Sequence, residues 1–170
     1  MPVNGFDINA FKANYQDLAR QYTFMIFINF PNNEMNSDTV KYLVQSSTMP
    51  ASEIEPIETN WQGHVFPLGS KQTFTDWTVT FKMDDAAKLR RSFLSWHTLI
   101  HDPETNIHGS PMDYMVDQEI WNLNPSGDPI MKMKLVNAWP TTIGEVTLDY
   151  TANEVQTFDV TWRYLYHIEV

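Results

Sequence analysis

Alternation of apolar and polar residues runs through most of this chain and predicts β-strands. Residues 73–82 alternate cleanly and place Trp77, Val79 and Phe81 on one face. Residues 155–168 repeat the pattern, with aromatic and branched side chains from Phe158 to Ile168 on one face. The remaining predicted strands cover residues 22–30, 41–47, 52–59, 113–122, 130–138 and 145–150.

A helical period appears in two places. Residues 84–100 begin with the acidic pair Asp84-Asp85, which suits a helix N-terminus, and continue with an apolar stripe at helical spacing. Residues 7–22 read as a short amphipathic helix, which makes up most of an N-terminal arm assigned to residues 1–21. The pattern predicts one mostly β domain spanning residues 1–170, with two packed antiparallel sheets and one flanking α-helix.

One stretch, residues 60–72, is polar and contains two glycines, and it predicts an extended hairpin or projecting loop. It also carries Trp61 and Phe66. An exposed tryptophan beside an exposed phenylalanine is typical of a binding surface. The alternative is a loop that folds back onto its own sheet.

The composition excludes several classes of protein. The 170 residues include no cysteine, which rules out disulfides, thiolate zinc sites and thiol nucleophiles. The formal net charge is −10, and each half of the chain contributes −5, so no basic arm is present to hold nucleic acid by its phosphates. The longest apolar run, residues 24–28, is too short to span a membrane, and no export signal is visible.

Few residues form a pattern that could make a catalytic or metal-binding site. His97 and His101 are four apart on the predicted helix, with His108 nearby, and two imidazoles at this spacing can share a zinc ion. Thr98 stands where the zincin motif requires glutamate. The simpler interpretation is that these histidines lie at the C-terminal end of the helix because its negative dipole end favours them. The acid pairs Glu53/Glu55 and Asp117/Glu119 have strand spacing and indicate a solvated acidic face rather than the facing carboxylates of a glycosidase.

Four stretches of the chain stand in a recognisable order and spacing: residues 69–96, with the Thr-Asp-Trp strand and the following helix; residues 138–150, which open on Ala-Trp-Pro-Thr; residues 153–166; and Met49-Pro50. In register, these four stretches resemble the tube proteins of contractile-tailed bacteriophages. The resemblance covers most of the chain from about residue 22 onward. It implies two roughly orthogonal antiparallel sheets in a β-sandwich or barrel, a fold shared with the type VI secretion tube protein.

The resemblance also implies a structural role. Subunits are expected to form hexameric rings that stack into a hollow tube inside a contractile sheath, with an acidic bore through which DNA passes without specific binding. The expected partners are further copies of the chain and the sheath, baseplate and tape-measure proteins. No membrane, catalytic residue, metal or cofactor is implied. The expected location is the virion tail, assembled in the host cytoplasm.

Candidate site residues follow from these expectations. The inter-ring contacts are assigned to the 60–72 stretch, namely Trp61, Gln62, Gly63, His64, Phe66 and Lys71, with the N-terminal arm as a second candidate contact. The acidic lining of the bore is assigned to Glu53, Glu55, Asp117 and Glu119. The alternatives are a tube subunit of a non-viral contractile injection system, a ligand-binding β-sandwich using Trp61 and Phe66, and a metal-dependent hydrolase using His97, His101 and His108.

Overall fold

The computed structural model describes residues 8, 11–12, 15, 18–32 and 35–170, and most of its regular structure is antiparallel β-sheet. The predicted N-terminal helix lies largely outside the described residues. The elements, in chain order, are β1 (Phe24–Phe27), α2 (Ser37–Val40), β2 (Val44–Ser47), β3 (Ser52–Trp61), β4 (His64–Phe74), β5 (Trp77–Lys82), α3 (Lys88–Ile100), α4 (Pro111–Tyr114), β6 (Val116–Leu123), β7 (Pro129–Ile143), β8 (Thr157–Arg163) and β9 (Tyr166–Glu169).

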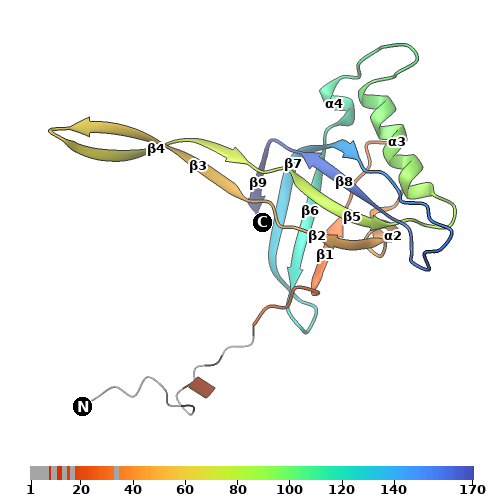
Figure 1. Ribbon diagram of the computed structural model, residues 1–170, viewed down its shortest axis with the longest axis horizontal. Helices are drawn as coiled ribbons and strands as arrows, with labels where there is room; N and C mark the ends of the chain where they lie inside the picture. The colour runs from red at the N-terminus through yellow and green to blue at the C-terminus, as the bar shows by residue number, and fades with distance from the viewer. Residues whose placement is uncertain (1–7, 9–10, 13–14, 16–17, 33–34) are drawn as a thin grey trace.

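The long strand β7 belongs to two layers. Its first part, up to Ala138, pairs with β6 and β9, and its last part, Trp139–Ile143, pairs with β8. The first layer is therefore β1-β6-β7-β9, and the second layer is β7-β8-β5-β2. In Figure 1, β5 and β8 run across the direction of β6 and β7. The predicted mostly β, two-layered antiparallel architecture is confirmed.

A β-bulge marks the bend of β7. Between the pairs Val116–Ala138 and Gln118–Leu135, β7 has two residues opposite the single residue Asp117. Asn137 adopts a positive φ of 54° there, and its backbone N–H donates to the Asp117 carboxylate at 3.0 Å. Bulges add local twist and bend to a strand, so this carboxylate stabilises the turn from one layer into the other.

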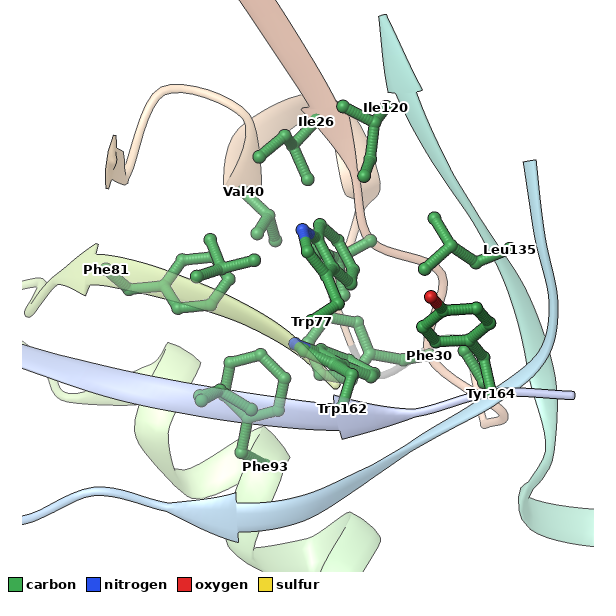
Figure 2. Close-up of a cluster of buried hydrophobic side chains, with 14 of the residues drawn as sticks. Ile26, Phe30, Val40, Trp77, Phe81, Phe93, Ile120, Leu135, Trp162 and Tyr164 are labelled. Atoms are coloured by element: carbon green, nitrogen blue, oxygen red, sulfur yellow. The ribbon is translucent and has the colours of Figure 1, made fainter. Parts of the chain in front are cut away.

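The core lies between the two layers and α3 (Figure 2). The inward positions predicted for β5 are confirmed, because Trp77, Val79 and Phe81 are all fully buried. Aromatic rings from several elements meet around Phe93 of α3. The buried side chains shown in Figure 2 include Ile26, Ile120 and Leu135 from the first layer and Trp77, Phe81 and Trp162 from the second.

Helix α3 begins at Lys88, four residues later than the sequence predicts. Asp84 nevertheless caps it, because its carboxylate accepts hydrogen bonds from the backbone N–H groups of Lys88 at 2.9 Å and Leu89 at 3.1 Å. Partial burial raises the pKa of Asp84, but these hydrogen bonds outweigh it and the net pKa is lowered. Ala87, with a φ of 50°, turns the chain between the capping residue and the helix.

Replacing Asp84 with alanine is expected to destabilise the subunit by about 1 kcal/mol, since a helix cap is lost. The pKa of Asp84 is depressed in the folded state, so its contribution is present above the unfolded value of 3.8 and disappears as the pH falls through the lower folded value. Urea denaturation at pH 7 and pH 3 measures both effects. Equal losses at the two pH values would contradict the assignment.

Two other predicted strands differ from the structure. Residues 155–168 form two strands because Leu165 donates its backbone N–H to Val136 at 3.0 Å, which moves the chain from the second layer to the first. Tyr166 and Ile168 therefore do not join the buried face. The predicted strand at residues 145–150 is wrong for the subunit, where this segment lies outside both layers.

Candidate assembly surfaces

The 60–72 stretch is part of a long two-stranded hairpin, β3-β4, that projects from the body of the molecule (Figure 1). Its turn is Gln62-Gly63, between the facing residues Trp61 and His64. Both turn residues have positive φ, 46° and 85°, which fits a two-residue hairpin turn and explains the glycine. The alternative in which the loop folds back onto its own sheet is therefore wrong.

The outer half of the hairpin has an apolar face. Side chains of directly opposed residues in an antiparallel pair share a face, and the pairing joins Trp61 with His64 and Thr59 with Phe66. Trp61 is 72% exposed and Phe66 is 61% exposed. Ile57 and Leu68 extend the same face, and sequence reasoning missed them, although their two-residue spacing from Thr59 and Phe66 was a usable signal.

The predicted contact residues therefore separate into three groups. Trp61, His64 and Phe66 lie on the apolar hairpin face, which we define as Ile57, Thr59, Trp61, His64, Phe66 and Leu68. Gln62 and Gly63 form the turn. Lys71 lies in a bulge of β4, where Ser70 and Lys71 oppose the single residue Glu55.

The four predicted bore acids do not form one surface. Glu53 and Glu55 are exposed on β3, which pairs with β4 in the separate hairpin sheet. Strand alternation places them on the same side of β3 as Ile57 and Trp61. Asp117 and Glu119 instead lie on β6, in the first layer.

Asp117 and Glu119 lie on the outer face of the first layer, because the alternate residues Gln118 and Ile120 are buried. Asp117 forms an ion pair with Lys134 at 2.8 Å, and Glu119 accepts a hydrogen bond from the Trp121 indole at 2.9 Å. Partial burial raises the pKa of Asp117, but Lys134 and the Asn137 N–H outweigh it, so the net pKa is lowered.

The outer face of the first layer is thus mixed in charge and partly aromatic. The Lys132 ammonium lies 4.1 Å from the centre of the Trp121 ring, and the Phe27 and Trp121 rings are 4.7 Å apart. Lys134 of β7 lies near both acids of β6, since it forms the ion pair with Asp117 and also interacts electrostatically with Glu119. This face therefore carries less negative charge than the sequence alone suggested.

Both ends of the first layer are free strand edges. Within the described residues, β1 pairs only with β6 and β9 pairs only with β7, while β2 ends the second layer. A groove of about 970 Å³ separates β1 from β2. Its lining includes the apolar residues Phe24, Ile26, Val44, Met49 and Ile120. Free edges of this kind readily accept another strand.

The three histidines do not gather into a metal site. The imidazole of His97 hydrogen-bonds the carbonyl of Pro140 at 3.2 Å, and burial lowers its pKa. His101 and His108 pair with each other, their ring centres 4.4 Å apart. Within the part of the chain that the structure describes, no group of three or more histidine or acidic side chains could hold a metal ion. The hydrolase alternative gains no support from this arrangement.

Comparison with known proteins identifies the family. A family model described as phage tail tube protein matches residues 3–170 of this chain. The chain belongs to the phage tail tube protein family. The resemblance stated from the sequence is confirmed, and the chain is a tube subunit of the kind found in contractile phages and related injection systems.

Individual relatives agree with the family match. Tail tube protein gp19 of Enterobacteria phage T4 is 27% identical over 148 residues, which cover 85% of this tail tube protein and 88% of gp19. The tail tube protein of Serratia phage KSP90 is 24% identical over 144 residues, covering 82% and 81% of the two chains.

Solved structures share the fold. A chain from the anti-feeding prophage cap superposes with a TM-score of 0.69 and 16% identity, covering 100% of this tail tube protein and 99% of that chain. A chain from the sheath-tube complex of the extracellular contractile injection system PVC gives a TM-score of 0.62 and 16% identity, covering 96% of this tail tube protein and 97% of that chain.

Among the described residues, no helix has both the length and the apolar character that a membrane span requires.

Proposed function

We propose that six copies of this tail tube protein close into a ring through the free edges of the first layer. The observation that carries the proposal is that one layer ends in two unpaired strands, β1 and β9. Pairing β1 of one subunit with β9 of the next is a head-to-tail contact, which closes into a ring when the rotation permits. It also removes two edges that would otherwise promote aggregation.

Rings of this kind stack through the β3-β4 hairpin into a hollow tube inside a contractile sheath. The apolar hairpin face projects from the body and has no partner within the described part of the subunit. Large exposed apolar side chains on a projecting element are typical of protein–protein contacts. The sheath, baseplate and tape-measure proteins are the other partners in this proposal, and assembly takes place in the host cytoplasm.

The outer face of the first layer lines the bore, since this layer forms the continuous wall of the ring. Asp117 and Glu119 then face the passing DNA together with Lys132 and Lys134. A wall without an excess of basic groups gains little from counterion release, so DNA slides past it. Glu53 and Glu55 lie on the hairpin and are assigned to the junction between rings.

Electron microscopy of the purified protein tests this function. Rings with sixfold symmetry and hollow tubes are expected at high protein concentration. A particle that stays monomeric at every concentration would refute both the ring and the stacking. A tube of a non-viral injection device is the second candidate, because the fold also matches chains of the anti-feeding prophage and PVC. DNA inside intact particles from the natural source favours the phage.

Replacing Glu119 with lysine is expected to permit tube assembly and to slow DNA delivery. The change gives the outer face of the first layer an excess of basic groups in all six subunits of a ring. Each added basic group can contact DNA phosphates. The measurement is the rate of DNA release from purified particles at low and high salt, with Glu119→Gln as the matched control. Delivery at the normal rate at both salt concentrations would show that Glu119 does not face the bore. Asp117 is unsuitable for this test because it holds the bulge in β7.

A further inference from the structure

Residues 145–150 have the sequence of a strand but no strand partner among the residues that the structure describes. Val146, Leu148 and Tyr150 alternate with Glu145, Thr147 and Asp149, yet the structure assigns no strand here. Val146 packs against the core, whereas Leu148 is 77% exposed and Tyr150 is fully exposed. Backbone groups of these six residues make no backbone–backbone hydrogen bond with any described residue.

The hairpin also has unpaired edges. Strand β4 pairs only with β3 among the described strands, so one side of its backbone is free along His64–Phe74. A two-stranded hairpin standing alone is marginal in water, and a third strand stabilises it. Residues 145–150 and the free edge of β4 therefore each lack a neighbouring strand.

These two features lie at opposite ends of the molecule. In Figure 1 the hairpin tip is at the far left, whereas the connection from β7 to β8, which contains residues 145–150, is at the far right. A repeating head-to-tail contact joins two different surfaces of the same subunit, and stacked rings require those surfaces to face opposite directions along the tube. The positions of the hairpin and the segment satisfy this requirement.

We propose that residues 145–150 of a subunit in one ring add as a third strand to the free edge of β4 in a subunit of the adjacent ring. The inference rests on the proposed stacking of rings and names the surface that receives the hairpin. Strand addition supplies main-chain hydrogen bonds, and the side chains supply specificity. Leu148 and Tyr150 then extend the apolar hairpin face beside Phe66 and Leu68.

Charge selects β4 rather than β3 as the acceptor. The segment carries Glu145 and Asp149 and has no basic residue. Strand β4 carries Lys71 and no acid, whereas β3 carries three glutamates. Each strand contains one proline, Pro67 in β4 and Pro56 in β3, so charge alone separates the two edges. Like charges across an interface disfavour a wrong partner, so addition at β3 is disfavoured.

Hydrogen exchange on rings and tubes tests the pairing. Tube formation is expected to slow exchange of backbone amides in both residues 145–150 and residues 64–74, by about tenfold or more at each segment. Protection of residues 64–74 in tubes while residues 145–150 exchange as fast as in free rings would overturn the inference and leave the stacking intact. Failure of the unmodified protein to form tubes would instead refute the proposed function.

A proline variant gives a second, independent readout. Thr147→Pro/Leu148→Pro removes two neighbouring N–H groups, which point to opposite sides of a strand, so a donor to β4 is lost in either register. Rings are expected to form normally and tubes to fail. The matched control is Ala152→Pro in the same connection, which should leave tubes unchanged. Tubes of normal length from the double variant would overturn the inference.

Cross-linking tests the identity of the two partners. Because the chain has no cysteine, the variant Thr147→Cys/Ser70→Cys reacts with a short bis-maleimide only at the chosen sites. Links between rings join chains into ladders longer than six, whereas links within a ring stop at six. Ladders beyond six are the expected result, and ladders that stop at six or a monomer alone would contradict the proposal. The pair Thr147→Cys/Ser126→Cys is the negative control.

Discussion

Replacing Trp61 and Phe66 with serine is expected to leave rings intact and to stop them from stacking into long tubes. The two side chains are among the most exposed aromatic groups of the hairpin, and neither belongs to the core. Buried aromatic anchors at an interface typically contribute about 2 kcal/mol or more each. A junction between two rings of six subunits contains both side chains six times. The loss of binding free energy is therefore on the order of 20 kcal/mol per junction. Tube length by electron microscopy is the measurement.

The control for this variant lies on the other face of the same hairpin. Glu58 and Asn60 alternate with Ile57, Thr59 and Trp61 and therefore point away from the apolar hairpin face. Glu58→Ser/Asn60→Ser changes the hairpin to a similar degree and should preserve tube length. Both variants should keep the thermal midpoint of the isolated subunit. Long tubes from Trp61→Ser/Phe66→Ser would remove the apolar hairpin face from the stacking contact.

Local pattern predicted those parts of the fold where one face of an element is buried along its whole length. Strand β5 and the stripe of α3 are examples, because Trp77, Phe81 and Phe93 are all fully buried. Pattern failed where pairing depends on distant residues. Residues 145–150 have strand alternation, but Gly144 donates its N–H to the carbonyl of Asp159, and the chain then leaves the sheet. Alternation of apolar and polar residues shows that the two faces of a segment differ in polarity. It does not show whether a partner strand is available.

The candidate site was predictable to a similar extent. Glycine and polar residues around Trp61 indicated a projecting hairpin, and the hairpin is present. The role of Asp117 could not be predicted, because its carboxylate meets the N–H of Asn137 only when β6 and β7 pair with a bulge. Strand spacing correctly placed Asp117 and Glu119 on one face, yet Lys134, which lies near both acids, comes from another strand, β7.

Replacing Phe93 with alanine is expected to cost about 3–5 kcal/mol, as for other fully buried phenylalanines. The side chain is completely buried, and its ring centre lies 5.2 Å from that of Phe30, 5.4 Å from Phe81 and 5.7 Å from Trp162. The loss therefore opens a cavity where both layers meet α3. Because domains are typically stable by 5–15 kcal/mol, it removes a large share of the total. Urea denaturation of the isolated subunit measures it.

Two variants make this measurement specific. Leu94 follows Phe93 on the same helix but is 47% exposed, so Leu94→Ala should change stability by about 0.5 kcal/mol or less. Phe93→Leu keeps most of the apolar volume and should lose less than Phe93→Ala. Equal losses for Phe93→Ala and Leu94→Ala would place the centre of the core elsewhere. Only folded subunits can assemble, and a smaller fraction of the Phe93→Ala variant is folded. This variant should therefore also need a higher protein concentration to form tubes.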